Sequence, residues 1–164
     1  MKAGPMIFQA DMGASLQLDE KAWLLLQALQ ADGRAPLKSL AAAAGLSIPA
    51  TAERLKRLQE AGVISGIHAE LDPRALGYAV RAIIGITAAQ PAKTRLLAKL
   101  RELPEVLECH HVTGADSYVM SVVATGLAEL EALIARINAF GETRTSIVLS
   151  SPIPRRGLQQ PPSP

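Results

Sequence analysis

The hydrophobic periodicity of this chain changes once, at Gly62, and the change divides its 164 residues into two parts of different architecture. Before Gly62, apolar residues recur at the spacing of amphipathic helices. After it, short runs typical of β-strands alternate with two further helical stretches. We therefore expect a helical domain over residues 17–63, a linker over residues 64–78 that opens with a short strand, and a mixed domain over residues 79–151.

Three helices are predicted in the first part from the residues at their ends. Asp19 is a good N-cap for the first helix. Pro36 stands where a first helical residue would, and it opens a short second helix that Gly45 terminates. Ser47 caps a third helix that runs almost to Gly62. A short helix, a turn containing glycine and a second helix form the helix-turn-helix arrangement, so we expect a three-helix (winged) helix-turn-helix domain.

The second part contains four predicted strands and two predicted helices in the order βαββαβ. This is the ferredoxin-like arrangement, in which both helices cover one face of an antiparallel sheet, so the fold class is α+β. Gly114, Ala115 and Asp116 mark the tight turn between the two middle strands. The predicted strands are Val80–Ala88, Val106–Thr113, Ser117–Ala124 and Thr143–Ser150, and the predicted helices are Ala92–Leu103 and Leu127–Phe140, the latter with a core stripe of Leu127, Leu130, Leu133, Ile134 and Ile137.

Both ends of the chain lack a sustained period. Residues 1–16 are predicted to form a flexible tail, and residues 152–164 a disordered tail, because five of the latter are proline. The single cysteine, Cys109, excludes an internal disulfide framework and a four-cysteine zinc site. No apolar stretch approaches the ~18 residues of a membrane span, and the N-terminus does not resemble a secretory signal. We therefore expect a cytoplasmic protein without membrane contact.

The net charge of +2 hides an uneven distribution along the chain. Residues 34–62 carry a net charge of +3, whereas all other residues together carry −1. The helical domain is thus a basic head, whereas the second domain is slightly acidic. An oligomer would carry one copy of this basic head per subunit. Aromatic residues make up only 3%, which argues against proteins that read single-stranded nucleic acid by stacking. The charges in the basic head are Arg34, Lys38, Arg54, Lys56 and Arg57 against Glu53 and Glu60.

The third predicted helix has one packing face and one face suited to DNA. The residues from Ser47 to Thr51 are small and lie at its N-terminal end, where they allow close approach to base edges and where the helix dipole attracts phosphate. Amphipathic helices with exposed cations also occur in proteins that bind no DNA, and Arg54 could instead hold the fold through Glu53 or a neighbour. The predicted DNA contacts are Ser47, Pro49, Ala50, Thr51, Arg54 and Arg57, with Lys38 and Lys56 on the backbone, and the predicted packing residues are Ile48, Thr51, Ala52, Leu55 and Leu58.

Ordered motifs in both parts of the chain carry a resemblance to a known family. They are Leu18-Asp19, Asp32-Gly33-Arg34, Gly45-Leu46-Ser47, Glu53-Arg54-Leu55-Lys56-Arg57-Leu58, Gly62-Val63-Ile64, Leu71-Asp72-Pro73, Val112-Thr113-Gly114 and Thr145-Ser146-Ile147-Val148. Across roughly residues 18–151 the chain resembles the Lrp/AsnC (leucine-responsive, feast/famine) family of prokaryotic transcription regulators. The resemblance implies DNA binding by a dimer built through the βαββαβ domain, which assembles further into tetramers or octamers. Such a dimer would read a pseudo-palindromic double-stranded operator with half-sites about 10 bp apart.

The resemblance also implies an amino acid or related metabolite that binds where dimers meet and changes assembly or DNA affinity. Asp116 would accept a hydrogen bond from the ammonium group of this effector, and Gly114 leaves room for the effector beside the main chain. Many family members place the aspartate one residue later, carry Asp where this chain has Ala22, and carry Pro-Gly where it has Phe140-Gly141, so leucine is not assumed to be the effector. The implied effector residues are Gly114, Asp116, Ser117, Thr145, Ser146 and Ile147.

Three other interpretations compete with an effector-gated regulator. A constitutive, architectural DNA-binding protein would need the helical domain but no effector. Some haem-pathway decarboxylases resemble the family in both domains, but a tetrapyrrole with several carboxylates needs clustered Arg and His, and the predicted sheet offers only Arg81 and two histidines. Cys109 and His111 share one strand face and could start a metal site, yet no further cysteine exists and His110 points to the other face. We therefore expect neither an enzyme nor a metal nor another cofactor.

Overall fold

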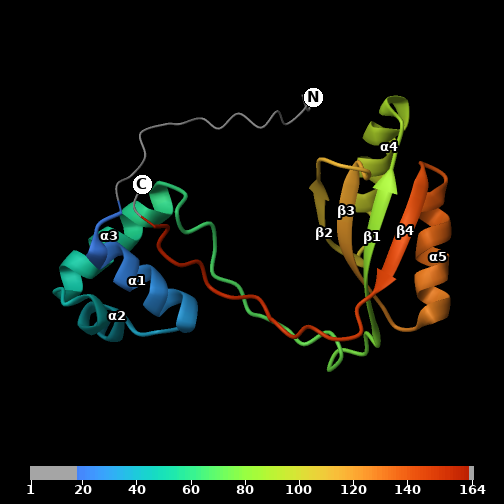
Figure 1. Cartoon of the computed structure of the whole chain (residues 1–164). Coiled ribbons are helices and arrows are strands. Elements are labelled where there is room, and N and C mark those ends of the chain that lie inside the picture. The colour runs from blue at the N-terminus through green and yellow to red at the C-terminus, as the bar shows by residue number, and fades with distance from the viewer. Residues whose placement is uncertain (1–17, 163–164) are drawn as a thin grey trace. The chain divides into compact units, whose positions relative to one another are not determined.

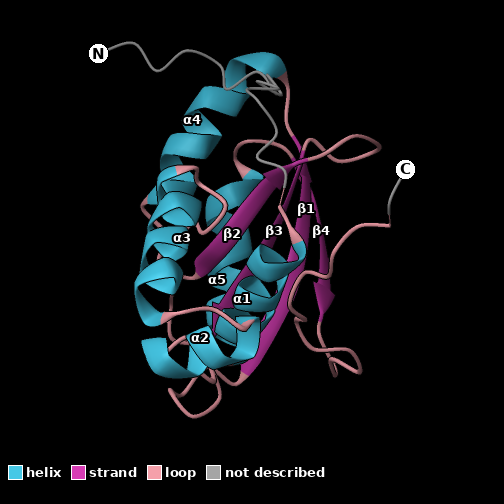
Figure 2. Cartoon of the chain, turned by 90° about the vertical axis from the view of Figure 1, so that its left-hand side faces the viewer, coloured by secondary structure: helices cyan, strands magenta, loops and turns pink. Residues whose placement is uncertain are grey.

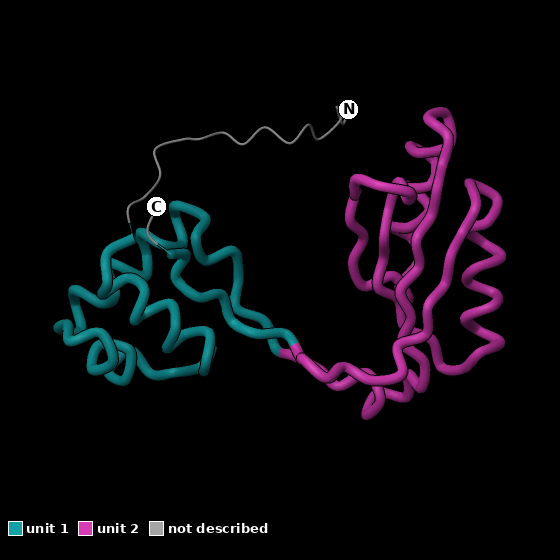
Figure 3. The backbone as a smooth tube through the Cα atoms, in the orientation of Figure 1, with its two compact units in different colours: residues 1–69, 155–164 teal, residues 70–154 magenta. Residues whose placement is uncertain are grey.

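The computed structural model describes residues 18–162, which form two compact units. Unit 1 comprises the residues up to Ala69 together with those from Arg155 onward, and unit 2 comprises Glu70–Pro154 (Figure 3). The chain therefore passes between the units twice, once before and once after unit 2. The predicted N-terminal tail, residues 1–16, lies outside the described residues.

Unit 1 contains three α-helices, which are α1 (Glu20–Ala31), α2 (Leu37–Ala44) and α3 (Ile48–Glu60) (Figure 1). The contacts at the helix ends confirm the predicted caps at Asp19, Gly45 and Ser47, whereas Pro36 is the N-cap of α2 and not its first residue. Asp19 caps α1 by accepting a hydrogen bond from the Ala22 N–H at 2.8 Å, and Ser47 caps α3. Gly45 ends α2 with φ at 61°, in the left-handed conformation that glycine adopts most readily.

The buried core of unit 1 is small. Helices α1 and α2 contribute its central cluster, which consists of Leu25, Leu40 and Ala44. The buried positions of α3 are Thr51 and Leu58, whereas Ile48 is 47% exposed and Ala52 is exposed as well. The prediction that Ile48 and Ala52 pack in the core is therefore wrong. Ile48 is the first residue of its helix, and burial along α3 begins only one turn later.

Residues 61–79 connect α3 to β1 of unit 2 without a helix or strand among them. The short strand predicted from Val63-Ile64 is therefore wrong, because a strand forms only against a hydrogen-bonded neighbour and the described part of unit 1 contains no other strand. For the same reason, the predicted winged helix-turn-helix has its helices but no β-wing within the described residues. A turn over residues 73–77, with Gly77 at φ 92°, ends the connection.

Unit 2 follows the predicted βαββαβ order. Its elements are β1 (Val80–Thr87), α4 (Gln90–Arg101), β2 (Val106–His111), β3 (Tyr118–Ala124), α5 (Leu127–Asn138) and β4 (Glu142–Ile147). The strands form one antiparallel sheet in the order β2-β3-β1-β4, shown in magenta in Figure 2. Strands β1 and β3 are thus central, and β2 and β4 are the edges.

One face of the sheet packs against α4 and α5. The core between them contains fourteen buried residues, and Ile84 in the middle of β1 is completely covered. Leu130, Leu133 and Ile137 of α5 are buried as predicted, but Leu127 is 64% exposed. Leu127 is the first residue of α5, so its predicted place in the core stripe fails for the same reason as that of the first residue of α3.

The other face of the sheet has no helix of unit 2 packed against it (Figure 1). On this open sheet face, Ile83 of β1 lies opposite Ser121 of β3, which in turn lies opposite Glu108 of β2. The side chain of Ile83 is 46% exposed. The face contains a shallow hollow of about 210 Å³, lined by Arg81, Ile83, Glu108, His110, Val119, Met120 and Ser121.

The last described residues form a C-terminal arm, residues 155–162, that belongs to unit 1. Gln30 of α1 donates a hydrogen bond from Nε2 to the Leu158 carbonyl at 3.1 Å and accepts one from the Leu158 N–H at 2.7 Å. This differs from the disordered tail predicted for residues 152–164. Proline prevents helix and sheet here, but it does not prevent an extended chain from being held by a side chain.

Candidate DNA-binding surface and effector site

The first turn of α3 presents small residues to solvent. Ser47, Pro49 and Ala50 are all exposed, and Ser47 Oγ accepts a hydrogen bond from the Ala50 N–H at 3.3 Å. Their size leaves the backbone of the turn open to close approach, and the positive end of the helix dipole favours phosphate there. The structure thus places three of the predicted DNA-contacting residues on one accessible turn of the helix-turn-helix.

Thr51 does not share this exposure. Its side chain is completely buried, and its Oγ1 donates a hydrogen bond to the Ser47 carbonyl at 3.0 Å. A covered side chain whose hydroxyl is already bonded within the unit cannot reach a base edge. The predicted DNA contact of Thr51 is therefore wrong, and this residue packs α3 into unit 1.

Arg54 is held by α1. Its Nη1 lies 2.8 Å from both carboxylate oxygens of Asp19, the residue that also caps α1. Together, the hydrogen bond from Arg54 and the one from the Ala22 N–H lower the pKa of the Asp19 carboxyl below its ordinary value. Of the two roles considered for Arg54, this geometry favours the one that holds the fold, with Asp19 rather than Glu53 as its partner.

Lys56, Arg57 and Lys38 are the accessible cations of the predicted DNA surface. Arg57 Nε lies 2.9 Å from Glu53 Oε1, and Lys56 Nζ lies 3.8 Å from Glu60 Oε1, each pair one turn apart on α3. Such exposed pairs are worth only ~0.3–0.5 kcal/mol, so a phosphate can replace the glutamate at little cost. Lys38, in the first turn of α2, is exposed and forms no salt bridge within residues 18–162.

The turn before β3 is fastened to the end of β1. The Ser117 N–H donates a hydrogen bond to the Ile86 carbonyl at 2.8 Å, and Thr87 Oγ1 donates one to the Ala115 carbonyl at 2.9 Å. Gly114 adopts a φ of 111°, which residues with a side chain rarely take, so the shape of the turn depends on glycine at this position. The three turn residues of the predicted effector site therefore lie together at one end of the sheet.

Asp116 forms an ion pair with an arginine that no sequence motif singles out. Arg144 Nη2, from β4, lies 2.6 Å from Asp116 Oδ1. The carboxylate occupies space above Gly85, where a Cβ atom would come within 2.6 Å of Asp116 Oδ2. A glycine inside an apolar strand such as β1 marks a close approach by another group. Gly85 is therefore the sequence signal that could have located this pair.

The three β4 residues of the predicted effector site do not share one face. Ser146 lies opposite Ile83, on the open sheet face, whereas Thr145 and Ile147 lie opposite residues of the helix-covered face. All three are exposed, since β4 is an edge strand. Of the three, only Ser146 lies on the face that carries the Asp116 carboxylate, and the structure separates the other two from it.

Comparisons with known proteins agree with this architecture. A family model for winged helix-turn-helix DNA-binding domains matches residues 18–65, and a model for the Lrp/AsnC ligand binding domain matches residues 81–158. The transcriptional regulator LrpA of Mycobacterium tuberculosis is 37% identical over 137 residues, which cover 82% of this chain and 91% of that protein. The chain belongs to the Lrp/AsnC family of transcription regulators.

Solved Lrp/AsnC structures share the whole two-unit fold. LrpC of Bacillus subtilis superposes with a TM-score of 0.81 at 25% identity, covering 85% of this chain and all (100%) of that one. A feast or famine regulatory protein of M. tuberculosis, complexed with L-methionine, gives a TM-score of 0.79 at 37% identity and covers 85% of this chain and 97% of that one. The predicted combination of a helix-turn-helix domain with a βαββαβ domain is therefore confirmed.

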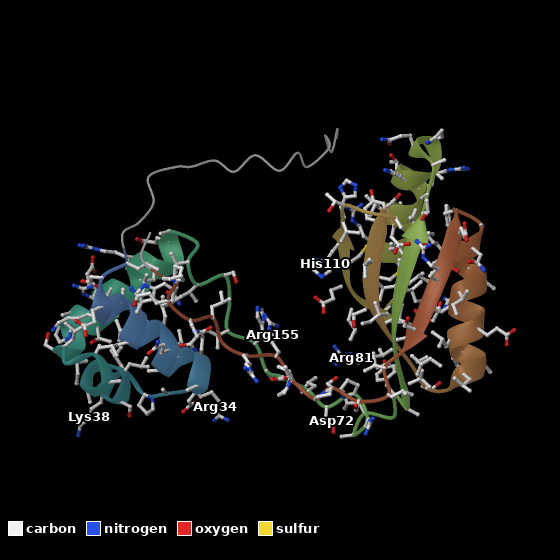
Figure 4. All side chains as sticks on the ribbon, in the orientation of Figure 1. Arg34, Lys38, Asp72, Arg81, His110 and Arg155 are labelled. Atoms are coloured by element: carbon white, nitrogen blue, oxygen red, sulfur yellow. The ribbon has the colours of Figure 1, made fainter. Side chains whose placement is uncertain are left out.

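Other chemistry gains no support from these comparisons or from the site. The Lrp/AsnC relatives are named as transcription regulators, which does not favour a decarboxylase. Burial raises the pKa of the Cys109 thiol. His110 lies on the open sheet face (Figure 4), with its Nε2 3.2 Å from Glu108 Oε2. The centre of the His111 ring lies 5.1 Å from that of the Tyr118 ring. Within residues 18–162, no three potential metal ligands gather, and no helix has the length and apolar character to cross a membrane.

Proposed function

We propose that this Lrp/AsnC chain is a homo-oligomeric regulator that binds double-stranded operator DNA through the first turn of α3 and responds to an amino acid bound beside Asp116. The observation that carries the proposal is the exposed start of α3, formed by the small residues Ser47, Pro49 and Ala50. A recognition helix reads base edges with its N-terminal residues, and flanking cations bind the backbone.

Within this proposal, the residues of unit 1 have different roles. The three small residues at the start of α3 approach the bases, while Lys38, Lys56 and Arg57 bind phosphates. Arg54 positions α3 on α1 through Asp19. Two copies of α3 in a dimer read a pseudo-palindrome whose half-sites are about 10 bp apart.

The phosphate contacts are tested by the salt dependence of binding to a mixed-sequence DNA duplex. Arg57→Ala and Lys38→Ala should each weaken binding to all sequences and reduce the slope of log affinity against log salt by about 0.9 per lost phosphate contact. Arg95→Ala, an exposed change on α4 of unit 2, is the control. Slopes equal to that of the control would refute the role of these two residues.

The Asp116–Arg144 pair supports an amino acid as the effector. A zwitterion carries one group for each partner, so its ammonium can bind Asp116 while its carboxylate binds Arg144. Relatives from M. tuberculosis and Neisseria meningitidis have been solved as complexes with L-methionine, which supports this ligand class. In the proposed site the turn residues Gly114 and Ser117 and the strand residue Ser146 surround the pair, whereas Thr145 and Ile147, on the other face of β4, are left outside it.

The open sheet face supports a dimer built through unit 2. Ile83 lies at the centre of this face and is 46% exposed, although it belongs to a central strand. The Ser121 Oγ beside it is buried and has no hydrogen-bond partner among the described residues. A second copy of the sheet would cover the apolar surface and could supply that partner.

Thermal shifts and sedimentation with each standard amino acid test the effector site. An amino acid that binds only the folded protein raises its melting temperature, and one that prefers one assembly changes its size. Asp116→Asn should abolish both responses, whereas Glu131→Gln, an exposed change on α5, should retain them. A wild-type protein that binds DNA but responds to no amino acid would favour a constitutive, architectural DNA-binding protein.

A further inference from the structure

The C-terminal arm is attached to unit 1 by a single side chain. The Gln30 amide bonds both backbone groups of Leu158, at 3.1 Å and 2.7 Å, as a neighbouring strand would. Gly157 lies directly against the same amide, since a Cβ atom there would come within 3.1 Å of Gln30 Oε1. These contacts fix the position of the arm on the last turn of α1.

The attached arm carries only positive charge. Residues 148–164 include Arg155 and Arg156 but no aspartate or glutamate. Both arginines are exposed, and neither forms a salt bridge in the part of the chain that the structure describes. Arg155 is labelled in Figure 4. Because Arg156 is two residues from Leu158, its Cα lies within about 7 Å of the anchored residue.

The anchor lies close in the chain to cations that surround the start of α2. Arg34 follows Gln30 in the connection to α2, and Lys38 lies in the first turn of α2; both are exposed and without a salt bridge among the described residues (Figure 4). The cations of α3, by contrast, are each paired with a carboxylate. In a helix-turn-helix, the helix before the recognition helix crosses the phosphate backbone. Arg34 and Lys38 thus lie at the helix that is expected to cross the phosphate backbone.

We propose that the C-terminal arm is part of the DNA-binding surface, with Arg155 and Arg156 binding phosphates of the duplex and Gln30 holding the arm in place. The inference rests on the proposed DNA binding by α3 and adds to it a contact from the far end of the sequence. Phosphate contacts carry no sequence information, so the arm raises affinity for every duplex without changing which operator is preferred.

The experiment compares full-length variants on one mixed-sequence DNA duplex by fluorescence anisotropy, between about 50 and 200 mM salt. The double variant Arg155→Gln with Arg156→Gln should lose about 0.9 of salt slope per phosphate contact, or nearly two per chain if both arginines bind. The matched control is Arg95→Gln with Arg101→Gln, which removes the same charge from exposed positions of α4 in unit 2 and should keep the wild-type slope. Gln30→Met keeps both arginines but removes the hydrogen bonds to Leu158, so it should lose part of the slope.

Each outcome bears on a different claim. If the arginine variant keeps the slope of its control, the arm does not bind DNA and the inference is overturned. If Gln30→Met binds like the wild-type protein, the anchoring role of Gln30 is overturned. A wild-type protein that fails to bind the duplex even at the lowest salt would instead contradict the proposed function itself.

Discussion

Unit 2 buries fourteen residues in one continuous core between its sheet and its two helices, whereas the central cluster of unit 1 consists of three buried residues with five partly buried ones around it. Unit 1 supplements this smaller core with polar contacts between distant parts of the chain. Asp19 binds Arg54, Lys21 Nζ donates to the Gly45 carbonyl at 3.1 Å, and Gln30 binds the arm. Each polar contact, including one that responds to pH, should therefore account for a larger share of the stability of unit 1, because its core is smaller.

The largest expected effect is on the core of unit 2. Leu133 is completely buried, so Leu133→Ala should lower the free energy of unfolding of unit 2 by about 2–5 kcal/mol, measured by denaturant titration with circular dichroism. Leu127→Ala, a change of the same size at a 64% exposed position of the same helix, is the control. Equal losses in the two variants would contradict the role assigned to packing.

A smaller effect is expected from the buried hydroxyl of unit 1. Thr51→Val removes the hydrogen bond to the Ser47 carbonyl and should cost about 1 kcal/mol of the stability of unit 1. Trp23, the single tryptophan, lies in α1 and reports the unfolding of this unit by fluorescence. Thr94→Val, the same change at an exposed position of α4, should leave the Trp23 transition unchanged. Unaltered stability with a large loss of DNA affinity would restore Thr51 as a DNA contact.

Acid should weaken unit 1 through Asp19. Hydrogen bonds from Arg54 and from the Ala22 N–H hold the pKa of Asp19 below its ordinary value of 3.8. The ionised carboxylate therefore contributes stability that is fully present above that value and is lost as the pH falls through the lowered pKa of the folded state. Asp19→Asn keeps an N-cap without the charge, so the Trp23 transition of this variant should depend less on pH in the acid range.

The control for this acid response lies in unit 2. There the pKa of Glu105 is lowered by its hydrogen bond with Arg136, so Glu105→Gln changes a group of the same kind outside unit 1. The acid dependence of the Trp23 transition should remain that of the wild-type protein in this variant. If the Asp19→Asn variant and the wild-type protein lost stability equally on acidification, Asp19 would not cause the acid dependence of unit 1.

The smallest effect is expected from exposed ion pairs. Lys56→Ala in unit 1 and Lys99→Ala in unit 2 each break an exposed ion pair between residues close in sequence and should change stability by no more than about 0.5 kcal/mol. Only Lys56→Ala should weaken DNA binding, which a duplex titration measures. The two variants should therefore have similar stabilities but different DNA affinities. Equal DNA affinities would remove Lys56 from the proposed interface.

The sequence predicted those features whose causes are local. Asp19, Gly45 and Ser47 determine helix ends through contacts within one turn, and the order of elements in unit 2 follows from periodicity. The incorrect predictions concern neighbours that no local pattern specifies. Ile48 and Leu127 have apolar side chains at suitable spacing, but each begins its helix and remains exposed.

The candidate site shows the same division. The start of α3 and the turn at Gly114 were predicted because small residues and glycine have local signatures. The partners of Arg54 and Asp116 were not predicted, because they lie 35 and 28 positions away in the sequence. Such pairings depend on tertiary structure, and only Gly85 gave a hint of one of them.

Unit 1 is assembled from both ends of the described chain, so no single continuous stretch of sequence contains all of it. A fragment that stops at Ala69 would keep all three helices yet leave the Gln30 amide without Leu158. Cleavage by a protease between β4 and Arg155 would have the same result in the intact protein, since the released peptide would contain Leu158. The contact between Gln30 and the arm thus forms only after the chain has been synthesised through Leu158.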